Sequence, residues 1–229
     1  MRRVGAWTAR AVTLLNRLRG RLPYPQRCRE LIARHAPGQS LVDVGCMWKV
    51  DGAYAFHALA HGAVRVTALD VHAPTPEFLA QNAAAGERVR FVQGDINDPA
   101  IADAIGVADI VFCSGVLYHM PNPILTLTRL RRICCRTLIL GSATIPEQRW
   151  PQSAVFLPYL RAGARRALTY PSADQKIGLD TEFVREWDYG NWFWGLTPSS
   201  VEAMLRATGF EVLERYPYRR SLCLVCRPG

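Results

Sequence analysis

The 229-residue sequence has few lysines and no long apolar run. Only Lys49 and Lys176 are lysines, so arginine supplies nearly all of the 28 basic residues behind a formal charge of +9. Such an excess is typical of nucleic-acid binding, but arginine without lysine, beside many alanines, also fits a GC-rich gene, so the charge carries little functional weight. No apolar stretch is long enough to cross a bilayer, and we find no signal-peptide pattern, internal repeat or low-complexity segment. We therefore expect a cytoplasmic protein.

The seven cysteines are an odd number, and most stand within apolar strands. We interpret them as reduced residues of the core. Cys223 and Cys226 have the spacing of a zinc motif, but residues three apart in a strand point to opposite faces. We expect no metal site.

The most informative stretch is residues 41–52, LVDVGCMWKVDG, where an apolar strand ends in Asp43 and Gly45. Apolar residues at helical spacing follow over 52–61. A glycine turn between a strand and a helix is how α/β proteins build a nucleotide pocket, because amide groups at the start of the helix face the turn.

Further strands follow, each with a polar end. Residues 64–71 end with Asp70, residues 89–96 with Asp95, and residues 108–115 lead into Tyr118 and His119. A helix over 124–133 and a fifth strand over 137–141 complete the series. The alternation predicts a Rossmann-like, mostly parallel α/β sheet with helices on both faces and ligands at the carboxyl ends of the strands. Each aspartate alone is also a common turn or cap residue, so their joint placement carries the argument.

A dehydrogenase is the obvious rival for this fold, but the G-x-G-x-x-G turn that cradles a pyrophosphate is missing. Over residues 40–143 the chain instead resembles the class I S-adenosylmethionine-dependent methyltransferases. The resemblance implies that the segment with Asp43, Gly45 and Cys46 contacts the methionine part of S-adenosylmethionine. It also implies that Asp70 binds the ribose.

The same resemblance implies that Asp95 and Ile96 hold the adenine, and that Ser114 lies at the cofactor. One departure is that Met47 and Lys49 stand where the family has glycines, which predicts a wider loop. The replacement of these glycines also leaves open the interpretation that the chain is a non-catalytic binding module with this fold.

Residues 113–123, CSGVLYHMPNP, are similar to the family's segment after the fourth strand. Methyl transfer to a hydroxyl needs a base, and His119 is our candidate, with Tyr118 shaping the pocket. The alternative makes His119 a structural residue that ties the loop to the next helix. Tyr24, between two prolines, is a further candidate to close over the cofactor.

Between the fifth strand and a helix over 199–207 lies an insertion, about 144–197, which we interpret as a lid. It is rich in aromatic residues, including four of the six tryptophans. Half of these rings would form a small core, and the rest could line an acceptor pocket. Two strands near 211–215 and 221–225 would complete seven strands.

The leading hypothesis is an O-methyltransferase acting on a small or oligomeric acceptor, such as a sugar, glycan or secondary metabolite. Residues 115–119 and 191–198 are also similar to the branch with the tRNA wobble-uridine carboxymethyltransferases, so an RNA methyl- or carboxymethyltransferase is the alternative. Those enzymes carry a long amino-terminal domain, of which we expect no counterpart here.

We divide the chain into a basic amino-terminal helical segment, 1–38, and a methyltransferase domain, 39–229. The candidate helix over 2–21 mixes apolar residues with many arginines. It would pack over the cofactor mouth or against a second subunit in a homodimer, or lie on an anionic membrane.

Overall fold

The computed structural model describes residues 22–168 and 182–229. The helix that we predict over 2–21 lies outside the described residues. The main sheet has seven strands in the order β3-β2-β1-β4-β5-β9-β8. These strands are β1 (Ser40–Val44), β2 (Arg65–Asp70), β3 (Val89–Gln93), β4 (Ala108–Ser114), β5 (Cys134–Ala143), β8 (Phe210–Pro217) and β9 (Ser221–Pro228).

The first five strands are parallel, and β9 and β8 follow as antiparallel neighbours at one side of the sheet. The predicted α/β sheet of seven mostly parallel strands is therefore confirmed. All five residues of β1 are buried, because a central parallel strand has helices over both of its faces.

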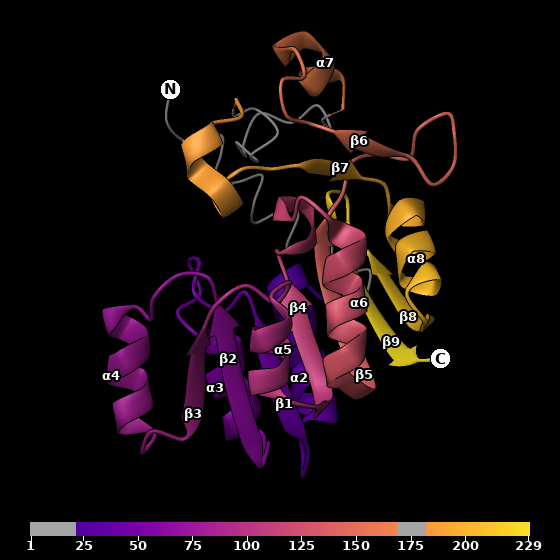
Figure 1. Cartoon of the computed structure of the whole chain (residues 1–229). Helices are drawn as coiled ribbons and strands as arrows, with labels where there is room; N and C mark the ends of the chain where they lie inside the picture. The colour runs from indigo at the N-terminus through magenta and orange to yellow at the C-terminus, as the bar shows by residue number, and fades with distance from the viewer. Residues whose placement is uncertain (1–21, 169–181) are drawn as a thin grey trace, which may run out of the picture.

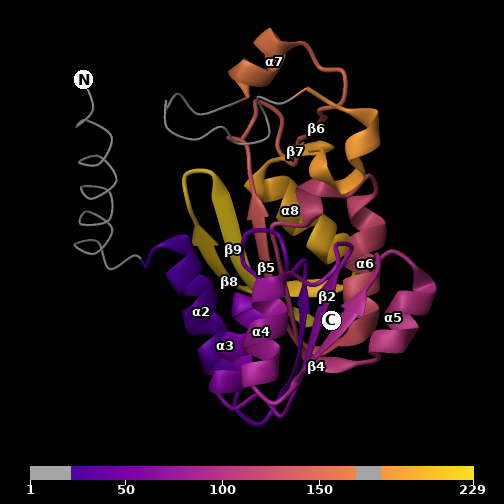
Figure 2. The same ribbon diagram turned by 90° about the vertical axis from the view of Figure 1, so that its left-hand side faces the viewer.

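Two helical layers cover the sheet (Figure 2). The helices α2 (Tyr24–His35), α3 (Ala53–Ala60) and α4 (Pro76–Ala84) contribute Leu31, Phe56 and Phe78 to the core on one face. The helices α5 (Pro99–Ile105), α6 (Pro123–Ile133) and α8 (Pro198–Ala207) cover the other face. The helix α2 thus packs directly on the sheet, although we place its sequence in the amino-terminal segment.

Local sequence explains where several helices begin. Proline occupies the first turn of α4, α5, α6 and α8, and each is preceded by a residue whose side chain accepts a hydrogen bond from the helix backbone. For α6 this residue is Asn122, which accepts from the Leu125 amide. A polar cap followed by proline suits the unpaired amides of a helix start.

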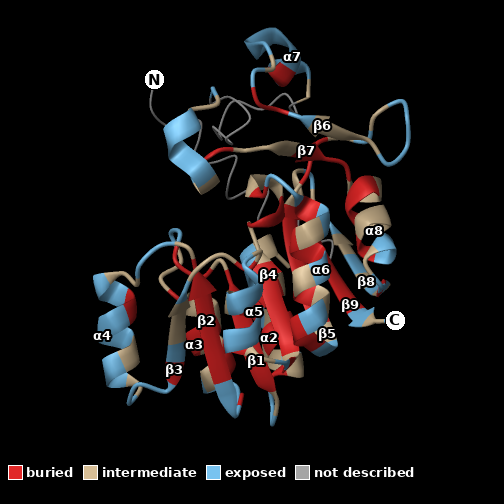
Figure 3. Cartoon of the chain, in the orientation of Figure 1, coloured by how far each residue is buried: buried red, intermediate tan, exposed pale blue. Residues whose placement is uncertain are grey.

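The insertion after β5 forms a separate layer above the carboxyl ends of the parallel strands (Figure 1). It contains a two-stranded antiparallel sheet of β6 (Ala154–Phe156) and β7 (Trp194–Leu196), the helix α7 (Ala162–Ala167) and the 3-10 segment η3 (Arg185–Gly190). Figure 3 shows that this layer is more exposed than the sheet below it. Its small core is formed by the buried Ile145 and Leu157, with Trp192 among the partly buried neighbours. Aliphatic side chains thus form its buried centre, whereas we expect half of the insertion's aromatic rings to do so.

The expectation that most cysteines lie in the core is confirmed, with one exception. Six of the seven cysteines are buried and free, whereas Cys135 is exposed. Cys223 belongs to the core on the α2 side and Cys226 to the core on the α6 side, so the two thiols lie on opposite faces of the sheet.

Candidate cofactor and acceptor site

Strand register brings the predicted site residues to one edge of the sheet. Val44 pairs with both Leu69 of β2 and Cys113 of β4, while Asp70 pairs with Gln93 of β3. The turns that follow these strands therefore open at the same edge, beneath the insertion. This edge is where open α/β sheets bind ligands.

Gly45 forms the sharp turn after β1. Its φ is +80°, and its amide donates to the Leu69 carbonyl at 2.8 Å. A Cβ atom at this position would lie 2.3 Å from Cγ2 of Val116. Both the backbone conformation and the close contact therefore require glycine.

The loop after Gly45 keeps a tight turn without the family's glycines. Lys49 and Asp51 adopt left-handed conformations with φ of 59° and 46°, which few residues other than glycine adopt. The Gly52 amide donates to the Cys46 carbonyl at 2.7 Å and closes the loop. Lys49 thus takes the backbone conformation that glycine would supply.

Asp70 links this loop to the second strand. One carboxylate oxygen accepts from the Met47 amide at 2.7 Å, and the other accepts from the His72 amide at 2.9 Å. Asp70 is only 5% exposed. Since each carboxylate oxygen has two acceptor positions, the group retains capacity for ribose hydroxyls.

Asp43 is the most unusual charged group at this edge. It is 1% exposed, and its Oδ2 atom has no hydrogen-bond partner. Burial raises the pKa of its carboxyl to about 7, although a hydrogen bond from the Ala55 backbone acts in the opposite direction. A buried carboxylate next to the turn suits a cationic ligand group, such as the ammonium of a methionine moiety.

Cys46 and Ile96 are two further predicted cofactor residues, and both side chains are buried. The Cys46 thiol donates to the Leu69 carbonyl, and Ile96 belongs to the core on the α5 side. Any contact of Cys46 with a cofactor would therefore come from its main chain.

Asp95 follows β3 and is engaged by the insertion. One carboxylate oxygen accepts from the Asn97 amide at 2.8 Å, and the other accepts from the Tyr189 hydroxyl at 2.5 Å. Tyr189 belongs to η3, 94 residues further along the chain. The sequence predicts Asp95 as a site residue but gives no signal that Tyr189 would contact it.

Tyr24 and Ser114, both predicted to be at the cofactor, contact each other. Their hydroxyl oxygens lie 2.7 Å apart, next to Gly141 of β5. A Cβ atom on Gly141 would lie 1.9 Å from the Tyr24 hydroxyl oxygen. Glycine in β5 thus allows the tyrosine of α2 to reach the end of β4.

Tyr118 and His119 lie in the 3-10 segment η1 (Leu117–His119), directly below the insertion. The Tyr118 ring packs against Trp192 with centroids 4.1 Å apart, and its carbonyl accepts from the Phe193 amide at 2.9 Å. Burial raises the pKa of Tyr118 to about 12. The pair therefore sits at the junction between β4 and the lid.

His119 is held in one orientation. Its Nδ1 atom lies 2.7 Å from the Asn191 carbonyl oxygen. Because a carbonyl can only accept, the proton of the neutral ring is on Nδ1, which leaves a lone pair on Nε2. Burial also lowers the pKa of His119, so the ring is neutral at neutral pH. The arrangement can accept a proton at Nε2.

Asn191 is a functional candidate whose role the sequence alone did not indicate, whereas Trp192 is one of the insertion's aromatic residues that could line an acceptor pocket. The Asn191 side chain bonds both the amide and the carbonyl of Val184, which closes the η3 segment. These bonds direct the main-chain carbonyl of Asn191 at Nδ1 of His119. The motif 191–198 marked Asn191 in the sequence, but its partner His119 lies 72 residues earlier in the chain.

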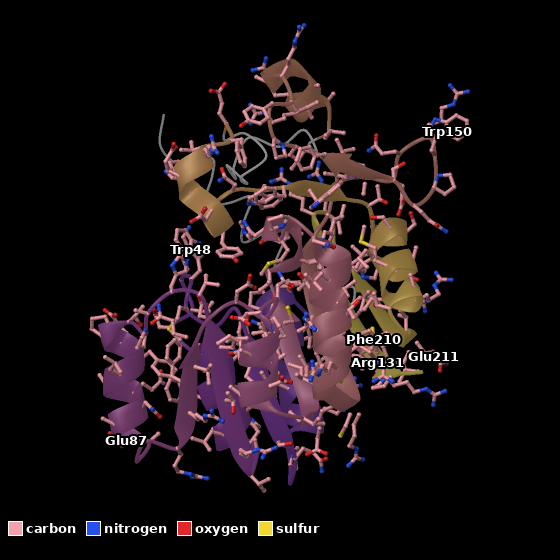
Figure 4. The ribbon with its side chains drawn as sticks, viewed as in Figure 1. Trp48, Glu87, Arg131, Trp150, Phe210 and Glu211 are labelled. Atoms are coloured by element: carbon pink, nitrogen blue, oxygen red, sulfur yellow. The ribbon has the colours of Figure 1, made fainter. Side chains whose placement is uncertain are left out.

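Exposed Trp48 marks the outer rim of the site. It stands on the loop after β1, on the side that faces the insertion (Figure 4). Its ring is 69% exposed and lies 6.1 Å from the ring of His72, which follows β2. Over residues 22–168 and 182–229, no three metal-binding side chains gather in one place, and no helix there is long and apolar enough to cross a membrane.

Comparison with known proteins agrees with this geometry. Residues 42–137 match the family described as "Methyltransferase domain". A tRNA U34 carboxymethyltransferase of Shewanella piezotolerans is 31% identical over 155 residues, which cover 58% of this chain and 44% of that protein. Its counterpart in Shewanella denitrificans is 32% identical over 156 residues, with 60% and 44% covered. The chain thus spans less than half the length of these curated relatives.

Solved structures also share the fold. The 1,6-didemethyltoxoflavin-N1-methyltransferase of Burkholderia thailandensis, solved with S-adenosylhomocysteine, has a TM-score of 0.61 at 18% identity. The superposition covers 97% of this chain and 88% of that one. At this level of identity the likeness extends to the fold alone.

Proposed function

We propose that this chain, whose residues 42–137 match a methyltransferase domain, is a class I S-adenosylmethionine-dependent methyltransferase that transfers a methyl group to a hydroxyl of a small or oligomeric acceptor. A sugar, a glycan or a hydroxylated natural product is the acceptor class. The observation that carries the proposal is the oriented His119, with its Nδ1 atom on the Asn191 carbonyl and Nε2 available as a base.

In this proposal the bound cofactor supplies an electrophilic methyl group on a sulfonium. Residues at the ends of β1, β2 and β3 hold it: Asp43 and Gly45 on the methionine side, Asp70 at the ribose, and Asp95 at the adenine. The ends of β4 and β5 lie beside it, where Tyr24 and Ser114 contact each other.

The acceptor half orients the hydroxyl group and removes its proton. Trp192, whose ring packs at a tilt against Tyr118, offers a flat apolar face for a ring-shaped acceptor. As the acceptor oxygen takes the methyl group that the bound cofactor would supply, its proton would pass to Nε2 of His119. Holding the acceptor in line accounts for much of the rate enhancement.

Calorimetric titration with S-adenosylmethionine and S-adenosylhomocysteine tests the cofactor assignment. We expect micromolar binding, weakened about tenfold or more in Asp70→Asn because that change alters hydrogen bonds to charged and hydroxyl groups. Asp103→Asn is the matched control, since Asp103 is an exposed partner of Arg132. Equal affinity in the wild-type protein and Asp70→Asn would contradict the proposed pocket.

A second candidate function is methyl or carboxymethyl transfer to tRNA. It is supported by the two curated relatives, both tRNA U34 carboxymethyltransferases. Under this alternative, tRNA would bind tightly, and the affinity would fall steeply with salt. Tight, salt-sensitive tRNA binding together with transfer to tRNA, and no transfer to hydroxylated small molecules, would favour this alternative.

The remaining alternative is a binding module that has lost turnover, for which Met47 and Lys49 in the turn are the argument. Cofactor binding without transfer to any member of a broad acceptor panel would favour it. Because Lys49 takes the left-handed conformation, the turn is retained, and we place catalysis ahead of this alternative.

A further inference from the structure

Tyr189 joins the insertion to the predicted adenine side of the site. Its hydroxyl donates to Oδ2 of Asp95, and its ring packs against the core on the α5 side. Burial, followed by the hydrogen bond to Asp95, raises the pKa of the phenol, so it remains a donor at physiological pH. A hydroxyl donating to a carboxylate is a charge-assisted bond and is stronger than a neutral one.

The rest of η3 is exposed. Arg185, Glu186, Trp187 and Asp188 lie at the surface, and Trp187 is 53% exposed. Asn191 holds the segment internally through Val184. Tyr189 therefore anchors η3 to the turn that follows β3.

Asp95 keeps room for another donor. A carboxylate has about four acceptor positions. The Asn97 amide uses one on Oδ1, and Tyr189 uses one on Oδ2. These two bonds set the direction in which the remaining positions point. An amino group arriving at this edge would find a carboxylate that is already oriented.

We propose that Tyr189 is a positioning residue of the cofactor site, which aims the Asp95 carboxylate at the adenine amino group and holds η3 over the bound nucleoside. This inference rests on the proposed function, because it assumes an adenosyl cofactor at Asp95. It adds a coupling: cofactor binding stabilises η3, and a well-ordered η3 strengthens cofactor binding by the same factor. Asn191, whose carbonyl holds His119, directly follows η3 in the chain.

The test compares wild-type protein with Tyr189→Phe, which keeps the ring and removes only the hydroxyl. Calorimetry would measure two ligands, S-adenosylhomocysteine and S-inosylhomocysteine, in which an oxygen replaces the adenine amino group. We expect Tyr189→Phe to bind S-adenosylhomocysteine about five- to tenfold more weakly, with little change for the inosine analogue. Discrimination between the two nucleosides therefore shrinks.

Tyr159→Phe is the matched control, because Tyr159 lies in the same insertion and is 80% exposed. Its affinities should equal those of the wild-type protein. Hydrogen exchange gives a second readout: S-adenosylhomocysteine should slow exchange of the amides of residues 185–191 in the wild-type protein and in Tyr159→Phe, but less in Tyr189→Phe.

The Asp95→Asn variant shows whether the effect of Tyr189→Phe acts through the Asp95 carboxylate or reflects a general loss of structure. In that background discrimination between the nucleosides should already be small, and adding Tyr189→Phe should change it little further. An equal loss of affinity for both nucleosides in Tyr189→Phe would make Tyr189 merely structural and overturn the inference, as would unchanged discrimination. If the wild-type protein binds neither ligand, the proposed function itself fails.

Discussion

The proposed cofactor half and the proposed acceptor half of the site are built in different ways. In the cofactor half, carboxylates at successive strand ends are oriented mainly by backbone amides, as Asp70 is by Met47 and His72. In the acceptor half, aromatic rings and a histidine from η1 meet a segment more than 70 residues later, as His119 meets Asn191.

The two halves differ in construction because they have different tasks. The cofactor half must present fixed acceptors to one molecule, and strand ends with tight turns do so with little side-chain motion. The acceptor half must recognise a particular substrate, and an inserted layer can vary without disturbing the sheet. Changes in the acceptor half should therefore affect turnover, whereas changes in the cofactor half should affect binding and folding.

The largest expected effect is that of His119→Gln. Loss of a general base typically lowers turnover by about 10²- to 10⁴-fold, and we expect S-adenosylhomocysteine affinity to remain within about twofold, in keeping with a loss confined to the chemical step. Methyl transfer to the best acceptor of the panel, beside calorimetry, measures both. His61→Gln is the control, because His61 is exposed and directly follows α3. Full activity in His119→Gln would remove this residue from the mechanism.

Gly45→Ala tests the cofactor half through its backbone. The new Cβ atom would meet Val116, and a non-glycine residue at φ +80° is strained, so we expect a loss of about 3 kcal/mol in the free energy of unfolding. Gly38→Ala separates the two causes, because Gly38 has a φ of +71° but no atom within 4 Å of the added carbon. It should cost about 1 kcal/mol. Urea denaturation measures both, and equal losses would contradict the packing argument.

Asp43 predicts a pH dependence of stability. Its pKa in the folded protein, about 7, lies above its ordinary value, so the folded state retains a proton that the unfolded chain releases. The free energy of unfolding therefore falls as the pH rises toward 7. Relative to Asp43→Asn, we expect the wild-type protein to lose about 2 kcal/mol between pH 5 and pH 8. Parallel pH profiles for the two proteins would show that Asp43 does not titrate in this range.

Much of the cofactor half could be predicted because its signals are local. Apolar strands that end in Asp43, Asp70 and Asp95, and a glycine at position 45, lie within about 50 residues of one another. Parallel pairing then places them on one edge by geometry alone. The contact between Tyr24 and Ser114 spans 90 residues, so the sequence could nominate each residue but not their pairing.

The acceptor half depended on tertiary structure. Aromatic composition marked the insertion, but no local pattern indicated that Tyr189 would reach Asp95 or that the Asn191 carbonyl would orient His119. Short elements such as β6 and β7 have too few residues for a periodic signal. The sequence by itself determined the sheet, its topology class and the acids at its edge, because these follow from periodicity and turn chemistry. Only the folded chain decided which rings and carbonyls meet above that edge, because those contacts form between segments that are distant in sequence.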